Sequence, residues 1–464
     1  MDRREFLTSH LLLGAGLGLG TLLTACSGGG AGEAGSSTPG ASTPGASTTS
    51  SGTADSSGSS GNPPVARSAA LRHVADADPA AAVATVNSLG AQLFGVLAKA
   101  QPSANLVLSP ASVAITLAMV REGAQGPTAT EMDDVLHTVD PAALSPSMNT
   151  LDQALRSRSG ARPDPAGTGA IEVTLKLANS VWGQQGTAWS AAFLDRLAIY
   201  YGAGLQLTSF TDDPDRATAA VNQWVSDQTA GRIPSLLSDG AIDAMTRLVL
   251  ANAIYLKAPW LTPFAKTATT DQSFARSTGA PARVPMMHSS GELAYATGDG
   301  WVAVDIPYAG YELTMSVVLP DAGRLAAVEA QLPSGLLDQV VGAQTITPVT
   351  LALPRWNTAS AVGLVDALGA LGMSAAFDPD RADFRGMTST ERLFLGAVQH
   401  QANVSVDEAG TEAAAATVAN MQATAAPVEP PVEVTVDRPF LFFIRDVPTG
   451  AVVFVGRVAD PSAL

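Results

Sequence analysis

The sequence predicts an α+β protein whose strands form mixed β-sheets. Helical patterns lie mainly in the first half of the chain and strand patterns mainly in the second half, and the two do not alternate as β-α-β units would. The composition is 46% hydrophobic, which is typical of a globular chain with a buried core. Beyond the N-terminal region about 400 residues remain, enough for one large domain.

Apolar residues at helical spacing predict helices at 79–97, 109–122, 190–201, 214–229 and 361–371. The first follows Asp78, whose side chain can cap a helix that begins at Pro79. Alternating or continuous apolar runs predict strands at 171–181, 248–257, 301–307, 313–319, 349–353, 393–406, 439–444 and 452–458.

The first 26 residues predict an export signal with a lipobox. Arg3 and Arg4 open a segment, "RREFL", that resembles a twin-arginine signal. The apolar stretch 11–23 is too short and too glycine-rich for a membrane span. It ends at Leu-Thr-Ala-Cys, and Cys26 is the only cysteine, so no disulfide within the chain is available to it. We expect lipid attachment at Cys26; the alternative is a cleaved signal with an incidental cysteine.

Residues 27–67 predict a disordered linker, because Ser, Gly, Thr, Ala and Pro dominate and little apolar surface is present to bury. The folded domain is then expected at 68–464. Together these segments predict an exported lipoprotein at the extracellular face of a bacterial membrane, held there only through the lipid at Cys26.

The charge and the motif content exclude several function classes. A net charge of −16 argues against nucleic-acid binding and against anionic membranes, because both need basic patches. The five histidines have no partner at ligand spacing, so neither a metal nor a cofactor is expected. No G-x-S-x-G or phosphate-binding glycine motif is present in the sequence. A Ser-His-Asp triad stays open, because its members need not be close in the chain.

The most informative segment runs from 398 to 418. Apolar and polar residues alternate from Val398 to Asp407, which predicts a strand. Small residues then follow from Thr411 to Thr417, including four consecutive alanines. Such a segment could slip between two existing strands without steric conflict. The alternative is an exposed, alanine-rich helical loop.

This segment and its surroundings resemble the serpins, a superfamily of serine protease inhibitors. "VSVDEAGTEAAAATV" (404–418) resembles the hinge of their reactive-centre loop, and "VDRPFLFFIRDVPTGAVVFVGRVADP" (436–461) resembles the strands that follow that loop. Further similar motifs occur in order at 105–132, 177–205, 221–237, 246–264, 284–287 and 353–387. The resemblance covers the chain from about residue 75 to its end. It implies three β-sheets, a helical cap and an exposed reactive-centre loop.

The resemblance implies suicide-substrate inhibition. A target serine protease attacks a bond in the loop and forms an acyl-enzyme, and the cleaved loop then inserts into the main sheet as a new strand. The hinge is assigned to Glu408, Gly410, Thr411, Glu412, Ala413, Ala414, Ala415, Ala416 and Thr417. Thr411 and every second residue after it would face the core, and all are small. Glu412 and Ala414 would face outward, where a charge is harmless.

Other positions match residues with assigned roles in the family. Arg355 is expected to pair with Glu408 at the base of the loop. Trp260 and His400 match residues where the sheet first opens. Ser112 and Asn252 match a polar cluster beneath the centre of the sheet. The basic helix of some serpins has no equivalent here, since its region offers only the scattered residues Arg156, Arg158 and Arg162, so no heparin site is expected.

Two counts locate the scissile bond differently. Counting from Gly410 places it at Thr424-Ala425, with Met421 and Ala423 as alternates, whereas counting back from the C-terminal motif reaches Pro427. The region between Arg392 and Arg438 contains no Lys or Arg, which disfavours trypsin-like targets. Small residues suit elastase-like or subtilisin-like enzymes. We therefore expect a monomeric, non-enzymatic inhibitor whose partner is a serine protease; the alternative is a non-inhibitory serpin-fold surface protein that acts in binding or scaffolding.

Overall fold

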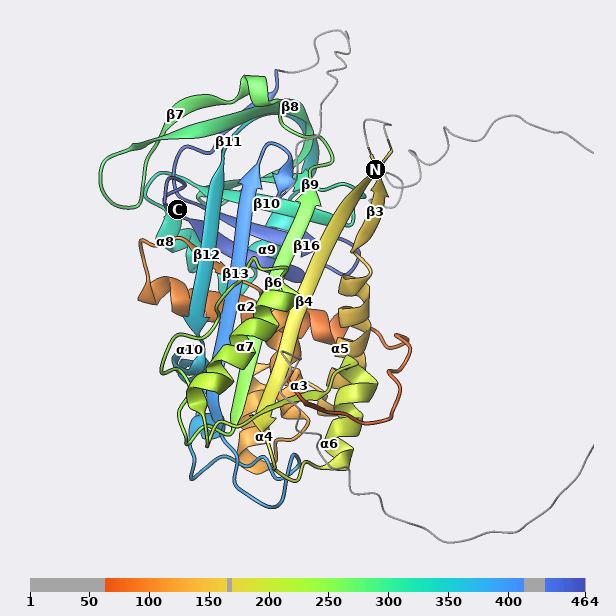
Figure 1. Cartoon of the computed structure of the whole chain (residues 1–464). Coiled ribbons are helices and arrows are strands. Elements are labelled where there is room, and N and C mark those ends of the chain that lie inside the picture. Colours follow the sequence, from red (N-terminus) through yellow and green to blue (C-terminus); the bar gives the residue numbers. More distant parts are fainter. Residues whose placement is uncertain (1–62, 165–168, 413–429, 464) are drawn as a thin grey trace, which may run out of the picture. The chain divides into compact units, whose positions relative to one another are not determined.

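The computed structural model describes residues 63–164, 169–412 and 430–463 (Figure 1). The predictions for the export signal, for Cys26 and for residues 413–429 lie outside the described residues. Within them the chain is α+β, as expected. The helices are α2 (Ala80–Ala100), α3 (Pro110–Arg121), α4 (Gly126–Val135), α5 (Pro141–Arg156), α6 (Ala191–Arg196), α7 (Pro214–Gln228), α8 (Leu325–Glu329), α9 (Leu336–Gly342) and α10 (Val365–Ala370).

The first sheet contains the long strands that surround the predicted hinge. Its order is β1 (Val65–Ala66), β5 (Leu205–Thr208), β4 (Ala170–Gln184), β6 (Leu248–Pro259), β14 (Gly410–Thr411), β13 (Leu395–Asp407) and β12 (Trp356–Gly363). The short strand β3 (Gly160–Pro163) pairs with β4. In Figure 1 the strands β4, β6, β13 and β12 lie side by side, with α7 in front of them.

The second sheet has nine strands. Its order is β15 (Val432–Thr435), β11 (Thr345–Pro354), β8 (Ala282–Gly298), β9 (Trp301–Pro307), β10 (Leu313–Pro320), β16 (Phe440–Asp446), β17 (Val452–Val458) and β2 (Leu106–Leu108), and β7 (Thr270–Phe274) pairs with β8. We expected three sheets in total. Hydrogen bonds instead join the remaining strands into this one sheet, because β8 is long enough to pair with β7 at its start, with β11 from Met286 to Tyr295 and with β9 at its end.

The first sheet is covered by helices on both faces. On one face α3 is buried almost throughout and contacts β4 and β6. On the other face α7 packs Val221 and Val225 against Trp182 of β4. By length and composition α2 could cross a membrane, but its apolar side packs into the core of this domain. A strand that entered the sheet would therefore have to fit between two packed layers.

Several predicted boundaries differ from the structure. The expected helix at 361–371 is strand β12 up to Gly363 and helix α10 from Val365, because side chains from 356 to 360 alternate between buried and exposed. The helix expected at 190–201 ends as a π-helical turn over Leu197–Tyr201. Helices α4 and α5 were not predicted. Asp78 accepts a hydrogen bond from the Ala80 amide at 2.9 Å, close to its expected capping position.

The linker is shorter than predicted. Val65 and Ala66 pair with β5 at the edge of the first sheet, although the linker was expected to reach residue 67. Beyond this strand, Arg72 donates to Asn149 at 2.9 Å and to Asp152 at 2.6 Å, both on α5. Backbone pairing and one arginine thus order a segment that has little apolar surface, a tertiary effect that its composition does not indicate.

Candidate functional site

The predicted hinge begins with a tight hairpin at one end of the first sheet. Strand β13 reverses direction through Glu408 and Ala409, and β14 returns between β13 and β6. Gly410 and Thr411 pair on one side with Asp407 and Val406, and on the other with Pro259 and Ala258. The beginning of the hinge therefore already occupies a strand position within the sheet.

The side chain of Asp407 organises the turn of this hairpin. Its carboxylate accepts hydrogen bonds from the amides of Ala409 at 2.8 Å and Gly410 at 3.2 Å. Gly410 has a φ of +150°, and a Cβ atom at this position would lie 2.2 Å from the Ala258 carbonyl oxygen. Glycine is required here by close approach of the backbones as much as by conformation.

Thr411 is fully buried and faces the core, as expected for the first small residue of the hinge. Its hydroxyl lies 2.7 Å from the hydroxyl of Tyr308. The Tyr308 ring stacks on Trp260 with centroids 4.5 Å apart, and burial raises the pKa of Tyr308 well above its usual value. Trp260 also donates from its indole nitrogen to the Asp407 carbonyl at 3.0 Å. Two stacked aromatic rings thus form the floor beneath the entry of the hinge.

Glu408 and Arg355 are in contact at the base of the loop. The Arg355 Nε atom donates to Glu408 Oε1 at 2.8 Å, and the hydroxyl of Thr269 donates to the same oxygen. The Glu408 side chain is 2% exposed and that of Arg355 is 41% exposed. Burial acts to raise the pKa of Glu408, but the hydrogen bonds from Arg355 and Thr269 outweigh it, so this pKa lies below its usual value.

Glu412 lies on the outer face of the sheet, as expected, but it is covered there. Its side chain is 8% exposed and lies 3.4 Å from Arg232, which belongs to the loop after α7. Its φ is +49°, in the left-handed region that side-chain-bearing residues rarely adopt. Burial raises the pKa of Glu412, only partly opposed by Arg232, Tyr255 and Lys257. A charge at this position is therefore not harmless, as had been expected, because burial disfavours it.

His400 was predicted to lie with Trp260, where the sheet first opens. It lies instead with the polar cluster under the sheet. It is opposite Asn252 in the register of β13 and β6, and its Nε2 atom accepts from the Ser109 amide at 3.0 Å. Burial lowers the pKa of His400 to about 3, so the ring is neutral at physiological pH. The neutral ring carries its proton on Nδ1, since Nε2 accepts.

The remaining members of this cluster come from α3 and the two central strands. Ser112 donates to Asn179 of β4, which is opposite Asn252 of β6. Thr116, one turn further along α3, donates to Asn252 at 2.6 Å. Ser109 caps α3 by accepting from the Ser112 amide. Hydrogen bonds from a buried helix thus hold the three strands together at mid-sheet.

Below the hinge the two strands that flank it come together. Leu395–Ala402 of β13 pairs in parallel with Leu248–Ile254 of β6. Between this direct pairing and β14, residues 255–257 of β6 and 403–405 of β13 have no pairing with one another among the described residues. Among the described residues of the hinge, Glu412 reaches this interval with its amide, which donates to Ser405 at 3.0 Å.

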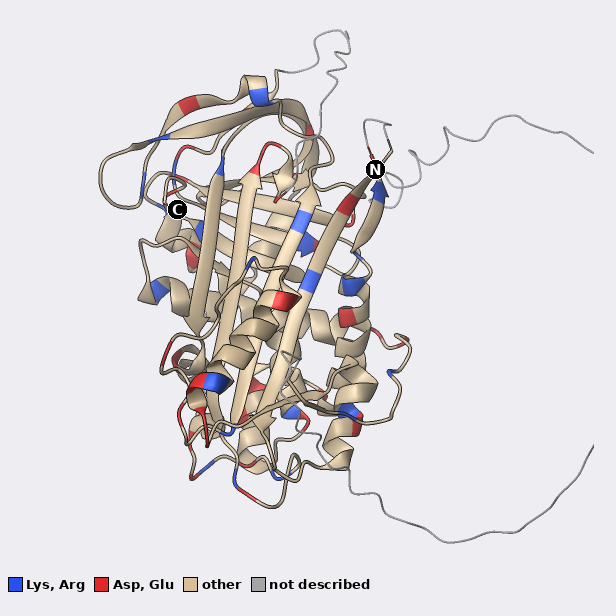
Figure 2. Ribbon diagram, in the orientation of Figure 1, with Lys and Arg blue, Asp and Glu red and all other residues tan. Residues whose placement is uncertain are grey.

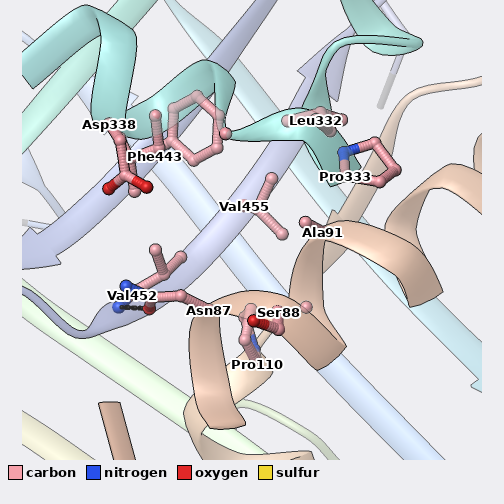
Figure 3. Close-up of a pocket in the computed structure, with 13 residues that line it drawn as sticks. Asn87, Ser88, Ala91, Pro110, Leu332, Pro333, Asp338, Phe443, Val452 and Val455 are labelled. Carbon is pink, nitrogen blue, oxygen red and sulfur yellow. Dashed lines mark hydrogen bonds between the residues drawn. The ribbon is translucent and has the colours of Figure 1, made fainter. Parts of the chain in front are cut away.

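A separate pocket of about 290 Å³ lies between α2, α9 and the second sheet (Figure 3). Asn87 on its wall already donates to the Gly450 carbonyl and accepts from the Val452 amide. None of its lining residues belongs to the hinge. In the described ranges, no cluster of three or more His, Cys, Asp or Glu side chains is arranged to hold a metal ion.

The three arginines that were considered for a heparin site are all ion-paired. Arg156 contacts Asp152 at 2.8 Å, and Arg158 contacts Asp446 at 2.5 Å. Arg162 pairs with Glu312. Acidic and basic residues are interspersed over the described surface seen in Figure 2.

Comparison with known proteins identifies the family. The model for "Serpin (serine protease inhibitor)" matches residues 84–461. Leukocyte elastase inhibitor A of Rattus norvegicus is 34% identical over 82% of this chain and 99% of its own length. An uncharacterized serpin-like protein of Thermococcus kodakarensis is 34% identical over 82% of this chain and 85% of its own length. The chain therefore belongs to the serpin family of serine protease inhibitors.

Solved structures agree with this assignment. The native thermophilic serpin tengpin superposes with a TM-score of 0.74 at 26% identity, over 85% of this chain and 99% of its own. Serpin48 of the insect Tenebrio molitor gives a TM-score of 0.70 at 27% identity, over 81% and 97%. The fold is therefore the serpin fold.

Sequence reasoning missed several residues that the structure places at the hinge and in the cluster below it. They are Ser109, Thr116, Asn179, Arg232, Tyr255, Thr269 and Tyr308. Only Ser109 carried a local signal, because a serine directly before Pro110 is typical of a helix start. The others come from elements distant in sequence and have no motif of their own.

Proposed function

We propose that this chain is a suicide-substrate inhibitor of serine proteases with an elastase-like or subtilisin-like specificity pocket. One observation carries the proposal: Gly410 and Thr411 are already paired between β6 and β13, at the open end of the interval that an inserted strand would fill. The chain turns over no substrate in this scheme, because each molecule is consumed with the protease that cleaves it.

The chemical step belongs to the protease. Its serine oxygen attacks the carbonyl carbon of Thr424, the bond to the Ala425 nitrogen breaks, and the new amine leaves with a proton. Thr424 stays attached to the protease as an ester. The ester survives only if the protease is displaced before water reaches it, and displacement requires the cleaved loop to insert.

The sheet determines what insertion requires. Residues after Thr411 would first fill the interval beside 255–257 and 403–405, and would then replace the direct pairing of β6 with β13. The new strand would be antiparallel to both neighbours, as β14 already is. Antiparallel pairs are slightly more stable per residue than the parallel pairs they replace, and a strand is added in exchange.

A protease panel tests the proposal. The purified protein is mixed with elastase-like, subtilisin-like, chymotrypsin-like and trypsin-like enzymes and analysed on denaturing gels. We expect a complex that survives denaturant with the first two classes. Cleavage of the loop by every enzyme, with no such complex, would reject inhibition and leave the binding or scaffolding alternative.

Specificity has its own test, because the scissile bond was assigned by counting. If Thr424 enters the specificity pocket, Thr424→Arg should create inhibition of a trypsin-like enzyme, since the cation pairs with the carboxylate of that pocket. Mass spectrometry of the C-terminal fragment released by the denatured complex locates the cut. A fragment beginning at Ala425 agrees with our assignment, whereas one beginning at Gln422 or Val428 assigns the pocket to Met421 or Pro427.

We further propose that the protein is an exported lipoprotein held at the membrane through Cys26. The sequence of the first 26 residues supports this, together with the polar linker before the described domain. Cys26→Ala should move the protein from the membrane fraction to the soluble fraction. Retention of that variant with the envelope would assign the attachment to another segment.

A further inference from the structure

Glu412 is the last described residue of the hinge. Its amide donates to Ser405 of β13 at 3.0 Å, as the next rung of the ladder after Thr411. Its φ of +49°, however, is not that of a strand residue. A residue within an antiparallel strand has φ near −140°. The backbone of Glu412 must therefore change conformation before any later residue can follow Thr411 into the sheet.

The side chain of Glu412 is held while this backbone conformation persists. It lies against the outer face of β6, where Tyr255 and Lys257 both oppose the rise in its pKa. Arg232 approaches from the other side, with its Nε atom 3.4 Å from Glu412 Oε2. The only basic residue of β6 is Lys257 and that of β4 is Lys176, and Figure 2 marks one basic position on each of these strands in blue. Lys176 is opposite Tyr255 in the register, so it belongs to the same face.

The two side chains of this ion pair differ in their exposure to solvent. The Glu412 side chain is 8% exposed, whereas that of Arg232 is 57% exposed. Arg232 can therefore leave for solvent at little cost, but Glu412 cannot keep its charge in place without a cation nearby. Burial raises the pKa of Glu412, and Arg232 is the largest opposing influence. The carboxylate consequently depends on Arg232 for its position.

We propose that Arg232 is a positioning residue for loop insertion, which holds Glu412 against β6 and so fixes the left-handed backbone conformation of Glu412. This inference rests on the proposed function. Because Glu412 must abandon both Arg232 and its present backbone conformation at the first step, their contact sets how fast the cleaved loop begins to enter. Neither the hinge motif nor the alanine run contains Arg232, which comes from the loop after α7.

The test measures insertion without requiring inhibition. Thermolysin cuts peptide bonds through a zinc-bound water and forms no acyl-enzyme, so it can cleave the loop but cannot be trapped. Insertion is followed after rapid mixing by tryptophan fluorescence, since Trp260 lies beside the hinge. Mass spectrometry verifies that the cut lies beyond Glu412. Five proteins are compared with wild type: Arg232→Ala, Arg232→Lys, Glu412→Gln, the double variant Arg232→Ala/Glu412→Gln, and Arg216→Ala.

We expect Arg232→Ala to accelerate the fluorescence phase about three- to five-fold, the range for one partly exposed ion pair. Arg232→Lys should remain closer to wild type, because it restores the charge. In the Glu412→Gln background, Arg232→Ala should add no acceleration. Arg216→Ala is the matched control, since it removes an exposed arginine of α7 that makes no ion pair among the described residues, and it should leave the rate unchanged.

Two results would overturn the inference: an unchanged rate in Arg232→Ala, or an equal acceleration with and without the Glu412 carboxylate. Absence of any insertion phase in the wild-type protein would overturn it as well. A fluorescence phase in wild type together with a negative protease panel would instead reject only the proposed inhibition.

Discussion

The pairing of β6 and β13 differs between the two ends of these strands. At the hinge end, Gly410 and Thr411 separate the two strands and pair with both. Towards the other end, Leu395–Ala402 of β13 pairs directly with Leu248–Ile254 of β6. The hinge end rests on the stacked rings of Trp260 and Tyr308, whereas the directly paired end rests on polar side chains of α3.

This difference indicates how the sheet can be both stable and able to accept a strand. The hinge end is preformed, so the first residues to enter meet a floor that already fits them. The directly paired end must be opened, and the hydrogen bonds of its polar side chains must break and re-form as the strands part. Substitutions that block entry at the hinge end should consequently abolish inhibition, whereas substitutions that disturb the native contacts of either end should lower native stability.

The largest effect is expected for Thr411→Arg. A guanidinium beside Tyr308 would be buried without a partner, so the hinge could not enter and the cleaved protein would be released as a substrate. We expect loss of the denaturant-resistant complex with cleavage retained, measured on gels. Thr411→Ser is the control, because it keeps the hydroxyl and a small volume. A wild-type yield of complex with Thr411→Arg would show that this end of the sheet is not the entry point.

The next largest effect is expected for Gly410→Ala. The added Cβ would lie 2.2 Å from the Ala258 carbonyl oxygen, an atom of the backbone that cannot rotate away. The native form should lose about 2–3 kcal/mol, the range for overpacking at a rigid site, measured as a shift in the urea midpoint. Gly95→Ala on α2 is a control of opposite sign, because nothing lies within 4 Å of its Cβ position and alanine favours a helix.

Many of the strand positions, and the direction of the first hinge side chain, could be predicted from the sequence. The strands at 301–307 and 452–458 were predicted at their observed bounds, because short, mainly apolar runs rich in valine and ended by turn residues have few alternatives. The inward direction of Thr411 followed from alternation along the hinge. Alternation also placed Glu412 on the outer face, but it did not indicate that Arg232 covers the side chain there.

What could not be predicted depends on contacts between distant elements. The position of His400 opposite Asn252 follows from the register of two parallel strands, and parallel register is not set by a local turn. Arg232 meets Glu412 only because the loop after α7 crosses the outer face of β6. Val65 becomes a strand residue only because β5 offers an open edge. In each case tertiary pairing overrides a local pattern.

A substitution in the directly paired end should affect stability more than inhibition. His400→Ala would leave the buried Ser109 amide without its acceptor and create a cavity under the sheet, which together should cost about 2–3 kcal/mol. We expect a lower urea midpoint with the yield of protease complex largely retained. The pKa of His400 is about 3 in the folded chain and near its ordinary value of 6.5 in the unfolded chain, so the unfolded wild type gains a proton below about pH 6.5. The loss should therefore be full at pH 8 and smaller by about 1 kcal/mol at pH 5.5. A loss that grew on acidification would contradict a neutral imidazole.

The smallest effect is expected for Arg355→Ala at the base of the hinge. The Arg355 side chain is 41% exposed, so solvent screening limits the loss to about 1 kcal/mol at pH 7. The pKa of Glu408 is lowered in the folded chain, so the pair stabilises the fold above the ordinary value of 4.5, and this stabilisation is lost as the pH falls through the lower folded value. The difference between wild type and Arg355→Ala in the urea midpoint should therefore be full at pH 7 and shrink below about pH 4.5. Arg324→Ala, which breaks a pair with the exposed Asp299, is the control and should leave the midpoint nearly unchanged at both pH values. A difference that grew on acidification would mean that Glu408 is held by burial and not by Arg355.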